Sequence, residues 1–199
     1  RYSSRDPTDE LEVPRLDELT PGIITPEQVG ALLAAAARDR LPAVLAPLCI
    51  GAFAGLRTSE LATLRWEDVG ADSIRVRPET AKARRQRHVP INDTLAAWLA
   101  VLRRPSGRVN PRAEARMAVL YRRVRLAAGI ARWPANALRH SFASYHYAHH
   151  QDAATLSAIL GHGDAGLLYR HYRALVTAAD AARYFALRPE QPARPATIP

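Results

Sequence analysis

Apolar positions recur with a helical period along most of the chain. Thr25, Pro26, Glu27 and Gln28 form a capping box with proline at the first helical position, which predicts an Ala-rich helix that runs to about Arg38. The almost wholly apolar stretch 43–54 predicts a second helix that stops at Gly55. The same pattern predicts further helices over 59–64, 93–102, 112–128, 136–149, 152–160, 164–172 and 177–186.

Two short segments depart from the helical period. Residues 73–77 alternate with period two, and 87–91 form a second strand candidate, with 78–86 as the turn between them. The pattern therefore predicts a mainly α fold with one small antiparallel β-sheet, an α+β class. No internal repeat is present.

The two ends of the chain are rich in residues that disfavour helices and strands. Residues 1–24 contain Pro7, Pro14, Pro21 and Gly22 among many charged residues and are expected to form a linker or arm. Residues 25–187 carry the periodic pattern and are expected to form one domain. The segment 188–199 contains four prolines and is expected to be a flexible tail.

The net charge of the chain indicates which kind of partner it binds. Twenty-eight Lys and Arg against 19 Asp and Glu give a net charge of +9, which favours a polyanionic partner. No apolar stretch approaches the roughly 20 residues that a membrane-spanning helix needs, and the first residues lack the apolar core of a signal peptide. The single cysteine, Cys49, lies within the apolar stretch and is expected to be a small buried hydrophobe.

Two segments in the first half of the chain carry candidate chemistry. Arg57 follows Gly55 at a helix start, and Glu60 lies three residues on, within reach of the guanidinium; the pair either orients Arg57 or is a surface ion pair. Lys82 stands in the predicted turn, where a lysine can enter a groove or belong to a solvated basic loop.

Two more segments follow in the second half. Arg139 and His140 belong to a helix whose apolar side includes Phe142. The sequence Leu160-Gly161-His162 predicts a tight turn that presents an imidazole, and Tyr169 and Tyr172 come after it.

Taken together, these motifs resemble those of the catalytic domain of tyrosine recombinases, the phage integrase family, and the resemblance covers roughly residues 25–187. The family has an Arg within G-L-R-x-x-E-L, a hairpin Lys, an H-x-L-R-H helix, an L-G-H turn and a C-terminal Tyr, and a subgroup ends in H-Y-R-x-L-V, as 171–176 do here. The resemblance implies the catalytic set Arg57, Lys82, Asn136, Arg139, His162 and Tyr172, supported by Glu60 and His140.

The resemblance also implies a mechanism. Tyr172 attacks a DNA phosphate and forms a 3′-phosphotyrosine, and each of the two arginines donates a bidentate pair of hydrogen bonds to the phosphate oxygens. Lys82 protonates the leaving 5′ oxygen, and His162 donates a hydrogen bond to the phosphate. Such a site needs neither a metal nor any other cofactor, and the phosphotyrosine conserves bond energy for rejoining.

The implied context is DNA recombination and integration. The expected partners are double-stranded DNA and further copies of the chain in a recombination tetramer, with no membrane. The resemblance implies a bacterial or phage-encoded protein of a mobile genetic element that acts in the cytoplasm at the nucleoid. Residues 1–24 would then be the linker from an N-terminal DNA-binding domain.

Several alternatives remain open at this level. Asn136 stands where the family has His, so the chain is either a recombinase or a DNA-binding protein that does not cleave, and a type IB topoisomerase would use similar residues. Tyr169 competes with Tyr172 as the nucleophile. Arg122, Arg123 and Arg125 form either a solvated helix face or a phosphate-contacting stripe. Four histidines lack metal-ligand spacing and are expected to be ordinary helix-face residues: His140, His146, His149 and His150.

Overall fold

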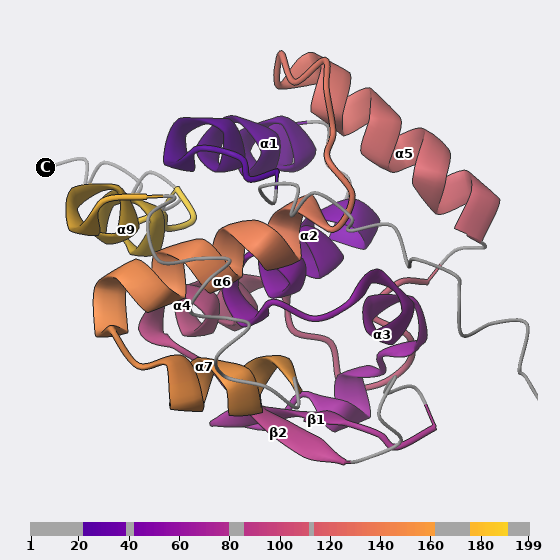
Figure 1. Cartoon of the computed structure of the whole chain (residues 1–199). Coiled ribbons are helices and arrows are strands. Elements are labelled where there is room, and N and C mark those ends of the chain that lie inside the picture. Colours follow the sequence, from indigo (N-terminus) through magenta and orange to yellow (C-terminus); the bar gives the residue numbers. More distant parts are fainter. Residues whose placement is uncertain (1–21, 39–41, 80–85, 112–113, 162–175, 191–199) are drawn as a thin grey trace, which may run out of the picture.

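The computed structural model describes residues 22–38, 42–79, 86–111, 114–161 and 176–190. This part of the chain is mostly helical with a two-stranded antiparallel sheet, which confirms the predicted α+β class (Figure 1). The elements in chain order are α1 (Pro26–Arg38), α2 (Pro42–Ala54), α3 (Thr58–Thr63), the 3₁₀ turn η1 (Trp66–Asp68), β1 (Ser73–Val76), β2 (Arg87–Pro90), α4 (Asp93–Leu102), α5 (Glu114–Ala127), α6 (Ala137–His150), α7 (Ala153–Leu160) and α9 (Ala178–Phe185).

Local side-chain caps define the helix starts where the sequence predicted them. The Thr25 hydroxyl accepts from the Gln28 N–H at 3.2 Å, and the Gln28 amide oxygen accepts from the Thr25 N–H at 2.9 Å. The Asn92 side-chain oxygen caps α4 by accepting from the Leu95 N–H at 2.9 Å, and Thr177 with Asp180 forms the predicted capping box of α9. Each cap satisfies backbone N–H groups that a helix start leaves unpaired.

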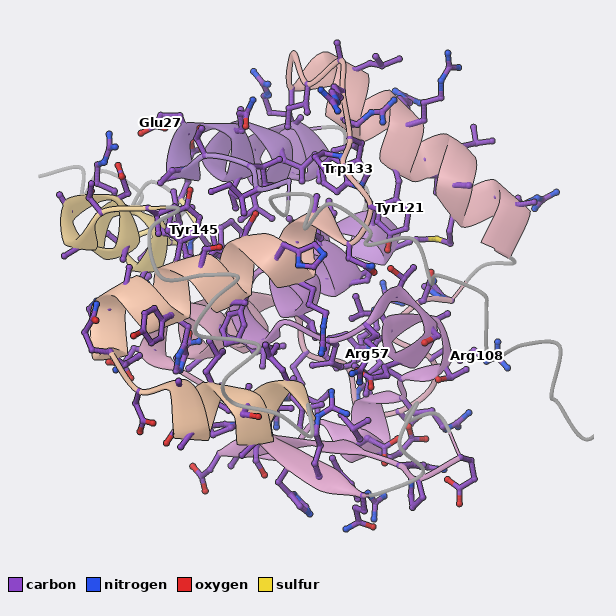
Figure 2. All side chains as sticks on the ribbon, in the orientation of Figure 1. Glu27, Arg57, Arg108, Tyr121, Trp133 and Tyr145 are labelled. Atoms are coloured by element: carbon purple, nitrogen blue, oxygen red, sulfur yellow. The ribbon has the colours of Figure 1, made fainter. Side chains whose placement is uncertain are left out.

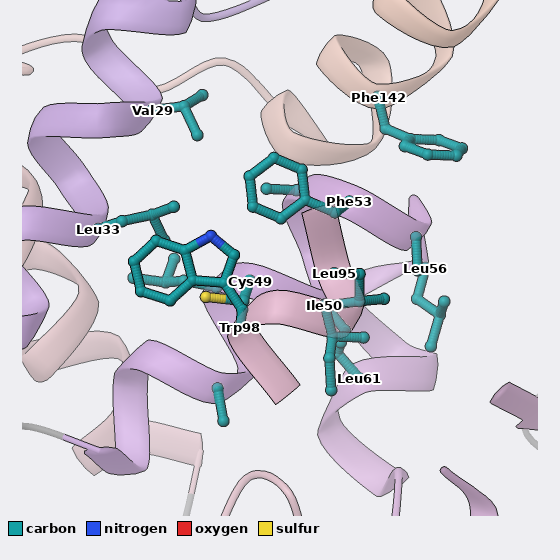
Figure 3. Close-up of a cluster of buried hydrophobic side chains, with 14 of the residues drawn as sticks. Val29, Leu33, Cys49, Ile50, Phe53, Leu56, Leu61, Leu95, Trp98 and Phe142 are labelled. Atoms are coloured by element: carbon teal, nitrogen blue, oxygen red, sulfur yellow. The ribbon is translucent and has the colours of Figure 1, made fainter. Parts of the chain in front are cut away.

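Helix α2 is the centre of the core. From Val44 to its last residue all its side chains are buried, as expected of a helix that is apolar on every face. Figure 3 shows Cys49, Ile50 and Phe53 of this helix packed among Leu95 and other apolar side chains of α1, α3, α4 and α6. The expectation for Cys49 is confirmed, and burial raises the pKa of its thiol.

The sheet covers the end of the molecule opposite α1 and α5, and α7 packs against β2 (Figure 1). Its register pairs Ser73 with Pro90 and Val76 with Arg87. Ile74 and Val89 are buried, whereas Arg75 and His88 point to the exposed face, so the period-two pattern is confirmed. The turn η1, before the sheet, was not predicted.

Both boundaries of the predicted domain carry contacts. The Ile24 N–H donates to the Ser141 hydroxyl at 2.9 Å, and its carbonyl accepts from the Tyr145 hydroxyl at 3.0 Å. Arg188 donates to Thr94 at 2.6 Å. The division into arm, domain and tail stays a prediction, because most of the arm and tail, together with the predicted helix 164–172, lies outside the described residues.

Within the described ranges, no helix is long and apolar enough to cross a membrane.

Candidate active site

The position of Arg57 is set by the residues on either side of it. Gly55 ends α2 with a φ of +63°, and a Cβ there would lie 2.3 Å from Phe142 Cδ1, so the turn requires glycine. Arg57 then caps α3: its N–H donates to Glu60 Oε2 at 2.9 Å and its Nη1 to Glu60 Oε1 at 3.0 Å. Glu60 is only 2% exposed, so the pair is an oriented, largely buried one and not a surface ion pair. Figure 2 shows Arg57 near the middle of the molecule.

Arg139 reaches the same region from α6. It is only 6% exposed, and it donates from Nη1 to the Gly55 carbonyl and from Nη2 to the Leu160 carbonyl, both at 2.8 Å. Arg57 Nη2 donates to the next carbonyl, that of Gly161, at 3.3 Å. The two arginines singled out from the sequence therefore converge on the turn that ends α7, immediately before residue 162.

A third arginine, Arg87 of β2, belongs to this cluster and was missed by the sequence reasoning. Its two terminal nitrogens donate to the two carboxylate oxygens of Glu60 at 2.9 and 2.8 Å, and its Nε donates to the Ile159 carbonyl at 2.9 Å. The sequence could have indicated this role, because Arg87 lies two residues before the buried Val89 and therefore on the same, inward face of the strand. An arginine on that face needs acceptors for its donors and favours an acidic partner for its charge.

Glu60 remains ionised despite its burial. Burial alone raises the pKa of a carboxyl group, but hydrogen bonds from Arg87 and Arg57 outweigh this effect and hold the pKa of Glu60 below its usual value. The three guanidiniums and this single carboxylate leave a net charge of +2 in the cluster. Such a cluster favours an anionic ligand.

Arg57 is the member of the cluster best placed to meet a ligand. Its side chain is 20% exposed. Its described contacts use two guanidinium N–H groups of the five that arginine carries. A planar fork of this kind matches the oxygens of a phosphate.

Asn136 and His140 lie at the beginning of α6. Asn136 is exposed and adopts a left-handed conformation with a φ of +52°, which asparagine tolerates better than most residues. Its side chain makes no cap hydrogen bond. His140 is half-buried beside Arg139. Lys82, His162, Tyr169 and Tyr172 lie outside the described residues.

The other histidines of α6 form a ring cluster near its C-terminus. The ring centroids of His146 and His150 are 4.4 Å apart, and those of His149 and His150 are 4.7 Å apart. His149 also packs against Phe185 of α9. In the part of the chain that the structure describes, no group of three His, Cys, Asp or Glu residues is arranged to hold a metal ion.

Comparison with known proteins gives the class of this fold. The sequence profile described as "Phage integrase family" matches residues 23–178, most of the chain. The chain belongs to this family, that of the tyrosine recombinase catalytic domains. No curated protein matches it.

Solved structures show the same architecture. The catalytic domain of bacteriophage HP1 integrase is 25% identical with a TM-score of 0.62, over 77% of this chain and 88% of that one. XerA recombinase is 22% identical with a TM-score of 0.63, over 90% of this chain and 68% of that one. Residues 75–356 of lambda integrase, a dimer bound to a COC′ core site, are 15% identical with a TM-score of 0.57, over 75% of this chain and 60% of that one. The last two likenesses concern the fold alone.

Proposed function

We propose that this protein is a site-specific DNA recombinase that cleaves and rejoins DNA through a covalent 3′-phosphotyrosine at Tyr172. The observation that carries the proposal is the convergence of Arg57 and Arg139 on the carbonyls of residues 160 and 161. His162 follows that turn directly in the sequence, and Tyr172 follows ten residues later.

The cationic cluster suits phosphoryl transfer. Attack on a phosphodiester accumulates negative charge on the non-bridging oxygens, and donors held in place before the reaction stabilise this charge at little reorganisation cost. Arg57 is partly exposed and has guanidinium donors that its contacts with the described residues do not use, while buried Arg139 is fixed by two carbonyls. In the proposed reaction Lys82 protonates the 5′ leaving oxygen, His162 donates a hydrogen bond to the phosphate, and Asn136 supplies a neutral one.

The distribution of charge supports double-stranded DNA as the partner. Residues 103–139 contain ten Arg and one acidic residue, Glu114, which accounts for the whole net charge of +9; the rest of the chain holds 18 basic and 18 acidic residues. Helix α5 carries four of these ten arginines: Arg116, Arg122 and Arg123 are exposed, and Arg125 is half-buried. We propose that this surface contacts phosphates beside the active site. Lambda integrase is described as bound to DNA in its structure, and XerH as bound to its difH substrate.

A nicked suicide substrate tests the proposal, because loss of a short fragment beyond the scissile phosphate traps the covalent intermediate. We expect an adduct that peptide mapping places on Tyr172. Tyr172→Phe removes the attacking oxygen and should abolish the adduct while DNA binding persists. Tyr169→Phe is the matched control and should keep the adduct. An adduct on Tyr169 would reassign the nucleophile.

The other outcomes separate the remaining functions. DNA binding without any adduct indicates a non-cleaving DNA-binding protein. An adduct accompanied by plasmid relaxation, but no strand exchange between two sites, indicates topoisomerase activity. Adduct formation in EDTA tests the expectation that no metal takes part, and assembly on paired sites, measured by light scattering, tests the recombination tetramer.

A further inference from the structure

Three consecutive backbone carbonyls at the C-terminus of α7 each accept a hydrogen bond from a different arginine. Ile159 accepts from Arg87, Leu160 from Arg139 and Gly161 from Arg57, at 2.9, 2.8 and 3.3 Å. The last carbonyls of a helix have no partner within the helix and form its negative end. The end of α7 therefore holds three guanidiniums in a fixed order along one turn.

Arg87 connects strand β2 to two helices, α3 and α7. Its fork onto Glu60 joins β2 to α3, and its Nε joins β2 to α7. Its side chain is 11% exposed, which leaves little of it available to a ligand. Gly161 adopts a φ of +64°, and a Cβ there would lie 3.2 Å from Arg87 Cδ, so the turn packs directly on the arginine stem.

We propose that Arg87 is a positioning residue for the cleavage reaction: it acts through Glu60 on the Arg57 guanidinium and holds the turn that carries the Leu160 and Gly161 carbonyls. This inference rests on the proposed function, since it concerns the orientation of Arg57 toward the DNA phosphate.

The physical reason lies in the burial of Glu60. Two arginines share this carboxylate, and both of its oxygens accept from Arg87. Without Arg87, Glu60 loses the guanidinium that spans both of its oxygens and keeps only Arg57, whose side chain contacts Oε1 alone. A buried carboxylate held by one such contact protonates or turns toward water. Either change removes or moves the acceptor of Arg57 Nη1. Lysine cannot restore the arrangement, because an ammonium lacks the planar fork that spans two oxygens and reaches a third acceptor.

The test is the single-turnover rate of adduct formation at saturating DNA. Arg87→Met keeps the apolar stem and should lower the rate about 10²-fold, the loss expected when a catalytic group is misplaced by about 1 Å. Arg87→Lys should recover only a small part of this loss. Arg75→Met is the matched control: it removes a guanidinium from the neighbouring strand, one that pairs with the buried Asp68, and should keep the wild-type rate.

A double-mutant cycle distinguishes positioning from general support of the fold. If Arg87 acts through Arg57, Arg87→Met should lower the rate by less than about 3-fold in the Arg57→Ala background, because the group that it positions is already absent. The same loss of about 10² in both backgrounds would overturn the proposal. So would a wild-type rate in Arg87→Met. If Arg87→Met does not fold, Arg87→Lys takes its place in the cycle with the same criterion.

Failure of the proposed function is recognised separately, because the wild-type chain then forms no adduct at all. In that case, side-chain ¹⁵N NMR spectra of Arg57 test whether Arg87 positions its guanidinium. Bonds at both Nη1 and Nη2 slow the rotation of the Arg57 guanidinium in the wild type, and Arg87→Met should accelerate it while Arg75→Met should not. Unchanged rotation in Arg87→Met overturns the inference.

Discussion

Arg57 and Arg139 carry the same charge in different surroundings. Arg57 is partly exposed, and its acidic partner Glu60 keeps a second arginine if Arg57 is removed. Arg139 is buried and donates to the carbonyls of Gly55 and Leu160, two residues that are themselves buried. The two residues should therefore respond differently to truncation even though both are proposed to act on the same phosphate.

We expect Arg57→Ala to lower the cleavage rate about 10²–10³-fold, the usual loss for one transition-state donor. Its stability should fall by about 1–2 kcal/mol, because Glu60 keeps both hydrogen bonds from Arg87. Arg139→Ala should lose cleavage as well and destabilise the fold by roughly 3 kcal/mol, because buried carbonyls lose their donors. For each variant, urea unfolding measures the change in stability, and the rate of adduct formation measures the change in cleavage. Equal stability of the two variants would contradict the burial argument.

Asn136 presents an amide at the position where the family has an imidazole. Asn136→His should leave cleavage unchanged or raise it, because histidine adds a group that can exchange protons and the exposed position has room for it. The left-handed backbone accepts histidine at a small cost, so the unfolding midpoint should change little. The measurement is the adduct rate between pH 6 and 8, with Asn136→Ala as control. A large drop for Asn136→His means that the site depends on the amide.

Helix α6 links the site to the C-terminal helix. Arg139 lies in its first turn, and its last turns pack against α9, where Tyr184 stacks on Tyr145 with ring centroids 4.2 Å apart. His146 is buried on this helix, with an Nδ1 that has no hydrogen-bond partner among the described residues. Burial and the neighbouring His150 lower the pKa of His146 to about 4, although Asp152 opposes the shift.

This shift predicts acid sensitivity. Between pH 6.5 and 4 the unfolded chain binds a proton at His146 that the folded protein does not, so stability falls as the pH falls through this window. The loss is on the order of 3 kcal/mol at pH 4. His146→Phe should remove it and raise the melting temperature at pH 5 relative to the wild type. The exposed His88→Gln is the control, and a parallel pH dependence of His146→Phe and wild type would contradict the prediction.

At the scale of the whole molecule, the net charge is confined to one stretch of the chain. Figure 1 shows α5 at one side of the molecule and α9 at another. Arg183 of α9 is paired with Glu27 and Asp180, whereas Arg122 of α5 has no ion pair within the described residues. Arginines that differ in this way should contribute differently to the binding of a polyanion.

We expect Arg122→Gln to reduce the slope of log affinity against log salt by about 0.9, the value for one lost phosphate contact. Arg183→Gln removes the same formal charge and should leave the slope unchanged. Fluorescence anisotropy with duplex DNA at several salt concentrations measures both. Equal slopes for Arg122→Gln and wild type would show that α5 faces solvent in the complex.

The sequence by itself determined the elements whose causes are local. Capping boxes at Thr25 and Thr177 act over three residues, and the periodic burial of apolar side chains fixed the helices and the two strands. The pairing of Arg57 with Glu60 was predictable for the same reason, since three residues on a helix bring side chains together. The turn η1 was missed because a three-residue element leaves no period to read.

Only the tertiary structure decided how the site is held. Glu60 and Arg87 are 27 positions apart, and Arg139 reaches a carbonyl 84 positions away, so no local pattern joins them. Residues so distant meet only when α2, α6, α7 and the sheet pack around one core, and burial then forces each charge to find a partner. Arg57 and Arg139 could be identified from the sequence motifs. Only the packing determined that Arg57 is the more exposed of the two and that the carbonyls of Gly55, Leu160 and Gly161 orient them.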